Sequence, residues 1–289
     1  MQMKLREWMW SYFFIGPNLL FLFVFLVFPL FYTFYLSFFE ADIYSSTFVG
    51  FDNFSSLFGE ELFLKAFVNT FYFVLIIVPC VIVISLVIAA FMQGFHKVSK
   101  SFFRLMFYLP VVSTPVVLSL VWAWMYNPSF GIIKYFSEVL GFGSVDVFSG
   151  QLSAILALSG IVVTWMVGQP IILYLSGMDG VPKDLYEAAE IDGAGALRTF
   201  FSITLPMISH TTLLIVITST ISVFQIFVVI HLITGGGPFH GTESLVYTIY
   251  RTAFVSLEFG KASAQSVILF FIILIISLLQ FRLMKTKLD

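Results

Sequence analysis

The sequence predicts an all-α integral membrane protein, a six-helix transmembrane bundle with a short helix in the loop between the fourth and fifth spans. Two observations support this prediction. Of 289 residues, 60% are hydrophobic and only 10% are charged, whereas soluble domains carry about 25% charged residues. The apolar residues also gather in six segments of roughly the 20 residues that a bilayer requires. We expect a single membrane domain over residues 1–289, with its core at about 67–283.

The six expected spans follow one another with modest loops between them. They run over residues 12–38, 67–92, 103–126, 152–175, 207–233 and 262–283. The first is too long for a signal peptide and lacks a small-residue cleavage site, so we interpret it as a retained helix. Pro79, Pro110, Pro115 and Pro170 lie inside the next three spans. Membrane helices tolerate them because neighbouring helices and hydroxyl groups bond the freed carbonyls.

Lysine and arginine residues orient the bundle. With six spans both termini lie on one side, and that side holds all but four of the 14 Lys and Arg residues. The four on the other side are Lys65, Lys134, Arg251 and Lys261. Cytoplasmic loops are enriched in positive charge. We therefore expect a multi-pass protein of the cell membrane with both termini, and the loop between spans four and five, in the cytoplasm.

That loop is a charged island between two apolar segments. Pro182 suits the first turn of a helix, and Asp184 and Glu187 lie near its positive N-terminal end. Gly193 is a natural helix stop. A second short helix, at about residues 196–202, is expected to lead into the fifth span. Helical pattern alone would also fit an ordinary amphipathic helix resting on the membrane.

The loop also carries a spaced signature. Glu187-Ala188-Ala189 is followed after three residues by Gly193 and after nine more by Ile203-Thr204-Leu205-Pro206. This pattern resembles the signature of membrane subunits of ABC importers. The resemblance implies that the loop is a coupling helix seated in a groove of an ATPase subunit. Carried over by position, the docking residues are Glu187, Ala188, Ala189, Asp192 and Gly193.

Three further strings resemble the maltose-type branch of carbohydrate permeases: residues 50–54 (GFDNF), 232–238 (LITGGGP) and 244–250 (SLVYTIY). The resemblance implies a permease subunit of an ATP-driven, binding-protein-dependent carbohydrate importer, with an oligosaccharide as the favoured substrate. Its implied partners are a second homologous permease subunit, two ATPase subunits and an external sugar-binding protein. ATP and Mg would bind to the partner ATPase, and no cofactor is expected in this chain.

No enzyme chemistry is visible in the sequence. It has no phosphate-binding glycine motif, and its four histidines lack the spacing of metal ligands. The net charge of -2 gives no reason to expect a nucleic-acid partner, and the single Cys80 excludes an internal disulfide. Charged residues fall near span ends or in loops, which argues against a proton-driven carrier.

Uncharged polar residues do occur inside spans four and five. The candidates for a substrate pathway are Trp165, Gln169, Ser219, Ser222 and Gln225. Amides and hydroxyls could bond sugar hydroxyls, and an aromatic ring could face the sugar ring. Hydrogen bonding between packed helices would explain the same residues, and the sequence favours neither interpretation for the stripe as a whole.

Two alternatives stay open. Within the importer class, the substrate could be glycerol phosphate or another polyol ester, although a phosphate would favour a basic residue in the pathway and none lies inside a span. In a different class, the chain could be a self-sufficient secondary carrier.

Overall fold

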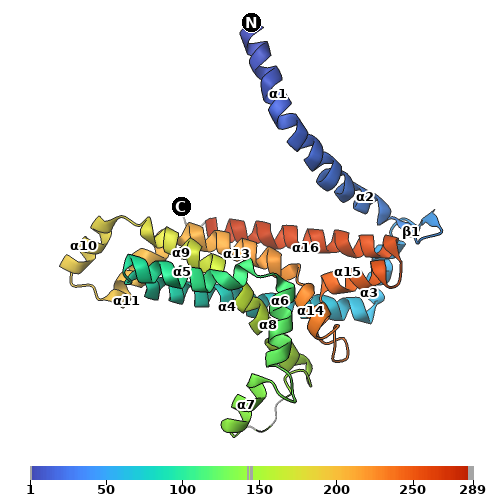
Figure 1. Ribbon diagram of the computed structural model, residues 1–289. Coiled ribbons are helices and arrows are strands. Elements are labelled where there is room, and N and C mark those ends of the chain that lie inside the picture. Colours follow the sequence, from blue (N-terminus) through green and yellow to red (C-terminus); the bar gives the residue numbers. More distant parts are fainter. Residues whose placement is uncertain (1, 142, 144–145, 286–289) are drawn as a thin grey trace. The chain divides into compact units, whose positions relative to one another are not determined.

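The computed structural model describes residues 2–141, 143 and 146–285 of the chain (Figure 1). The chain divides into two compact units, Met1–Glu60 with Ile249–Phe271, and Glu61–Thr248 with Ile272–Asp289. The division falls inside two helices, α15 (Leu245–Phe254) and α16 (Phe259–Lys285). A single membrane domain stays a prediction.

The first unit begins with one long helical stretch that corresponds to the first expected span. It consists of α1 (Gln2–Leu22), a π-helical turn η1 (Phe23–Val27) and α2 (Phe28–Leu36). Trp10–Leu36 of this stretch is apolar enough to cross a membrane, and none of its most apolar window is buried. Such a surface is suited to lipid or to another helix.

A small hairpin follows, which the sequence did not lead us to expect. Its strands β1 (Phe39–Ala41) and β2 (Ser46–Phe48) are antiparallel, with Phe39 opposite Phe48. Asn53, on α3 (Asp52–Gly59), donates hydrogen bonds from Nδ2 to the backbone oxygens of Ser37 and Phe39, at 2.9 and 2.8 Å. These bonds fix the hairpin against the start of α3.

The second unit is a helical bundle around α4 (Glu61–Gln93), which continues through Pro79. Phe73, Ile77, Val81 and Ala89 are fully buried and recur at multiples of four residues along one face of this helix. That face packs against α9 (Gly168–Asp179) and α13 (Ser209–Phe224), and α9 in turn packs against α5 (Lys97–Val112). The other helices up to residue 248 are α6 (Pro115–Met125), α7 (Ile132–Val139), α8 (Gln151–Met166), α10 (Lys183–Ile191), α11 (Ala196–Thr199), the π-helical turn η2 (Phe200–Thr204), α12 (Leu205–Met207) and α14 (Val228–Ile233).

Three of the expected spans are interrupted. The third bends by 96° between α5 and α6, and the fourth bends by 47° between α8 and α9. The fifth leaves helical geometry at residues 225–227, between α13 and α14. Local chemistry accounts for the first two: Thr114 caps α6 with Pro115 at its first position, and Pro170 lies in the first turn of α9. Proline favours a helix start because it lacks the N–H that an interior position needs.

Within the described residues, four helices are long and apolar enough to cross a membrane, or six if each bent pair counts as one span. The expected all-helical membrane class is thereby confirmed. Figure 1 shows α10 beyond the ends of α9 and α13 in the second unit, with α6 and α14 toward the other end of that bundle.

Candidate functional site

The charged island forms the helix that its sequence predicted. In α10 (Lys183–Ile191), Pro182 takes the capping position rather than the first turn, and Asp184 lies in the first turn. The helix stops at Gly193, whose φ of +72° suits glycine. The N–H of Gly193 bonds to the oxygen of Glu190 at 3.0 Å, and that of Ala194 to the oxygen of Ala189 at 2.9 Å. This is the Schellman pattern of helix termination.

The second short helix of the loop differs from expectation. Instead of one α-helix over residues 196–202, α11 gives way at Phe200 to the π-helical turn η2, in which the N–H of Leu205 bonds to the oxygen of Phe200. Pro206 has no N–H for the carbonyl of Ser202, so the regular α-helical bonding pattern cannot continue. π-Helical turns of this kind are frequent at functional sites.

The five residues expected to dock an ATPase do not all face outward. Glu187, Ala188, Asp192 and Gly193 are exposed, whereas Ala189 is 8% exposed and covered by the chain itself. Two residues that the sequence did not single out are the most exposed large apolar residues of the loop. Ile191 is 87% exposed and Leu197 is 76% exposed. Their only sequence signal was an aliphatic side chain among charged neighbours.

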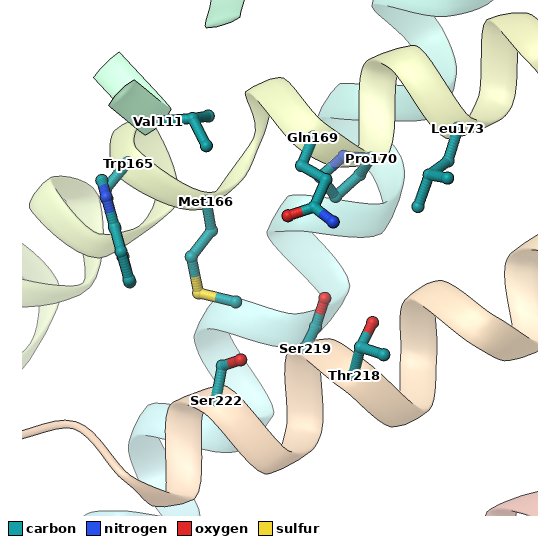
Figure 2. A pocket seen from close by; sticks show the side chains of 9 residues that line it. All are labelled: Val111, Trp165, Met166, Gln169, Pro170, Leu173, Thr218, Ser219 and Ser222. Atoms are coloured by element: carbon teal, nitrogen blue, oxygen red, sulfur yellow. The ribbon is translucent and has the colours of Figure 1, made fainter. Parts of the chain in front are cut away.

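Several polar residues of spans four and five line one cavity, here called the α9–α13 pocket (Figure 2). Its volume is about 120 Å³. Its lining is Val111, Trp165, Met166, Gln169, Pro170, Leu173, Thr218, Ser219 and Ser222. Figure 2 shows the Gln169 amide pointing toward α13, from which the Ser219 hydroxyl points back. The structure therefore brings together four of the five residues that the sequence proposed for a pathway.

The fifth residue, Gln225, lines a neighbouring cavity of about 230 Å³, here called the α6–α14 pocket. The two pockets share Trp165, Met166 and Ser222. Met166 and Thr218 also line these pockets and were not among the candidates from the sequence. A lone methionine in an apolar span carries no signal. Thr218 lies four residues before Ser222, on the same face of a helix, and that spacing was its signal.

Hydrogen bonding distinguishes the pocket side chains from those that join helices. The side chains of Gln169 and Gln225 are exposed, and no hydrogen bond joins either amide to another described residue. The indole N–H of Trp165 is buried and has no partner among the described residues. By contrast, Thr220 is fully buried and accepts a 2.9 Å hydrogen bond from Nε2 of Gln280. Thr220 therefore joins helices, while its neighbour Ser219 faces a cavity.

The pockets lie where the three interrupted spans meet. Val111 and Pro115 flank the α5–α6 bend, Trp165 and Gln169 flank the α8–α9 bend, and Gln225 lies in the gap after α13. The close approach of α9 to α5 depends on Gly168, because an added Cβ there would collide with the backbone oxygen of Phe107 on α5. At membrane depth, non-helical backbone occurs where it is buried in protein or lines a water-filled cavity.

The comparison with protein families identifies the chain. Residues 54–286 match the family described as the inner membrane component of binding-protein-dependent transport systems. The chain belongs to this family. It is thus a multi-pass, inner-membrane permease subunit of an ABC importer and not itself an enzyme, which confirms the resemblance found in the Glu187–Pro206 signature.

Curated relatives point to one kind of transport system. The sn-glycerol-3-phosphate transport system permease protein UgpA of Yersinia enterocolitica serotype O:8 is 35% identical over 246 residues, which are 84% of this chain and 82% of the relative. The UgpA protein of Agrobacterium fabrum is 30% identical over 280 residues, covering 96% and 94%. That of Escherichia coli strain UTI89 is 31% identical over 281 residues, covering 96% and 94%.

Solved structures show the same fold. A chain of a bacterial ABC transporter involved in the import of the acidic polysaccharide alginate matches with a TM-score of 0.81, covering 97% of this chain and 96% of that chain. A chain of the alginate transporter in complex with its alginate pentasaccharide-bound periplasmic protein matches with a TM-score of 0.87, covering 98% and 96%. Both are 20% identical to this chain and are compared by fold alone.

Proposed function

We propose that this permease subunit imports a small polyhydroxylated solute, with glycerol phosphate or a related polyol ester as the leading candidate. The observation that supports this substrate is the identity of 30–35% to UgpA proteins over most of both chains. The sequence analysis had placed an oligosaccharide first and a polyol ester second. The relatives favour the reverse order.

The pockets support a small solute and leave a neutral carbohydrate as the second candidate. Their volumes of about 120 and 230 Å³ fall below the range of roughly 300–1,000 Å³ that is usual for ligand sites. Their described lining contains amide, hydroxyl and indole groups but no Lys, Arg or His. An uncharged lining suits a neutral polyol or sugar. A phosphate would need positive charge from another subunit.

A second, homologous permease subunit is part of the proposal. One subunit offers pockets that open on one side, so a closed pathway requires a partner surface opposite Gln169, Ser219 and Gln225. In the proposed assembly an external binding protein delivers the solute. Both termini and α10 lie in the cytoplasm, as the distribution of Lys and Arg indicates.

The energy would come from two ATPase subunits, which hold the ATP and Mg. The docking element is α10 with its flanking turn. Glu187, Ala188, Asp192 and Gly193 present polar groups and backbone, and Ile191 and Leu197 present exposed apolar side chains. Removing such apolar side chains from water on docking would favour association. Ala189, which is small and buried, would let α10 lie close to its own bundle.

Uptake by the complete transporter tests this proposal. Cells or proteoliposomes that contain the full complex and its binding protein should import labelled glycerol 3-phosphate, and uptake should stop with vanadate or without the ATPase. Import of neutral oligosaccharides with no uptake of glycerol 3-phosphate would favour the second candidate. Uptake driven by an ion gradient in the absence of any ATPase would overturn the importer assembly in favour of a secondary carrier.

A further inference from the structure

One hydrogen bond joins α10 to the rest of the bundle. The hydroxyl of Tyr186, in the middle of α10, lies 3.1 Å from Oγ1 of Thr204. Thr204 is 6% exposed and Tyr186 is half-buried. In the described part of the chain no other side-chain hydrogen bond links α10 to another element.

The surroundings of this bond are open. A cavity of about 650 Å³ lies between the loop and the helix ends, with Tyr186, Glu190 and Ala194 on the loop side and Gln93 and Met178 on the bundle side. Ala189 is the only residue of α10 that is buried. A loop held over a cavity can move relative to the bundle unless specific contacts join the two. The Tyr186–Thr204 bond and the packing of the Tyr186 ring are such contacts.

Thr204 lies on the segment that connects the α10 loop to α13, the helix that lines the α9–α13 pocket. It is the last residue of η2, directly before α12 and α13. α13 has 16 residues and is about 24 Å long. Toward its far end, Ser219 and Ser222 line the α9–α13 pocket. A displacement of Tyr186 would therefore act on the chain just before α13, whose far end contributes to the pocket wall.

We propose that the Tyr186–Thr204 pair transmits movement of α10 into α13 and is a positioning contact for transport. It adds a defined residue pair to the docking role proposed for α10 and rests on that role. The pair touches neither solute nor nucleotide. Its loss is expected to separate ATP hydrolysis from transport rather than to prevent assembly.

The test compares solute imported per ATP hydrolysed in the assembled transporter. Tyr186→Phe and Thr204→Val each remove one hydroxyl and keep the side chain's shape. Both should retain wild-type yield and wild-type co-purification of the ATPase. The ratio of uptake to hydrolysis should fall by about threefold or more, as expected when one hydrogen bond is lost. The double variant should be no worse than either single variant, because both remove the same bond.

Two controls separate a coupling role from a structural one. Thr204→Ser keeps a hydroxyl and should restore the ratio. Thr199→Val removes a hydroxyl that lines the same cavity but bonds within its own turn, to the oxygen of Gly195 at 3.2 Å, and should leave the ratio unchanged. A wild-type ratio in Tyr186→Phe and Thr204→Val, with the ATPase bound, would overturn the inference alone. Failure of the wild-type subunit to bind an ATPase would overturn the docking proposal and the inference with it.

Discussion

The loop around α10 and the α9–α13 pocket are two regions of one bundle built in opposite ways. The loop is a continuous stretch of about twenty residues, exposed and charged, with apolar side chains such as Ile191 and Leu197 on its surface. The pocket is assembled from three interrupted helices and contains no charged residue among its lining. The loop is shaped by its own backbone, through the Gly193 turn, whereas the pocket exists only when distant segments pack.

This difference separates two kinds of function. A surface that must fit a soluble partner needs exposed groups held in one geometry, and a capped helix supplies them. A pathway through a membrane needs polar groups without a fixed partner, which only a cavity can hold without a large desolvation cost.

The largest effect concerns the side of the membrane on which the loop lies. After Cys80 is replaced by serine, a cysteine at Ser45, at the exposed hairpin turn, should react with an impermeant thiol reagent added outside intact cells. A cysteine at Ala194 should react only after the membrane is opened. In intact cells, each of the two cysteines is expected to be either fully labelled or not labelled at all. The reverse labelling pattern would place α10 outside and remove it from any contact with an ATPase.

The next effect concerns the shape of the loop. Gly193→Pro should abolish co-purification of the ATPase, because proline fixes φ near −65° where the chain needs +72° and removes the N–H bonded to Glu190. We expect a loss of at least about tenfold, since strain of a few kcal/mol is involved. Glu187→Lys should weaken binding less, by reversing one exposed charge.

A proline two residues later is the matched control. Gly195 has a φ of −71°, and an added Cβ there would meet nothing within 4 Å. Gly195→Pro should therefore bind the ATPase normally. Equal loss in the two proline variants would mean that the loop tolerates no rigid residue and that the turn at Gly193 has no special role.

How much of each region can be inferred from sequence follows from how it is built. The Gly193 stop and the helix before it were predictable because local backbone chemistry produces both. The π-helical turn after Phe200 was not predicted, although Pro206 gave a reason to doubt a regular helix. The 96° and 47° bends were not predictable from Pro110, Pro115 and Pro170, because membrane helices also carry prolines without breaking. Met166 is the last residue of α8, directly before the 47° bend, so its place in the pocket depends on that bend.

A moderate effect is expected in the pocket. Gln169→Leu and Gln225→Leu should each lower uptake about threefold to tenfold or change solute preference, since each removes an amide that has no partner within the described chain. Complex yield and basal ATP hydrolysis should stay at wild-type levels. If the amides instead bond a partner helix, yield and thermal stability would fall together with uptake. Wild-type uptake in both variants would remove these residues from the pathway.

The smallest effects are expected at two adjacent residues of α13, one affecting stability and the other affecting uptake. Thr220→Val removes the acceptor of the 2.9 Å bond from Gln280 and should lower stability by about 1 kcal/mol, which thermal unfolding of the purified complex would detect. Solute preference should not change. Ser219→Ala removes a hydroxyl that lines the α9–α13 pocket and should do the opposite, altering uptake with little change in stability. Because the residues are neighbours on one helix, a general disturbance of α13 would affect both measurements in both variants. Only a helix with one face bonded to its neighbours and one face lining a pathway gives the reciprocal pattern.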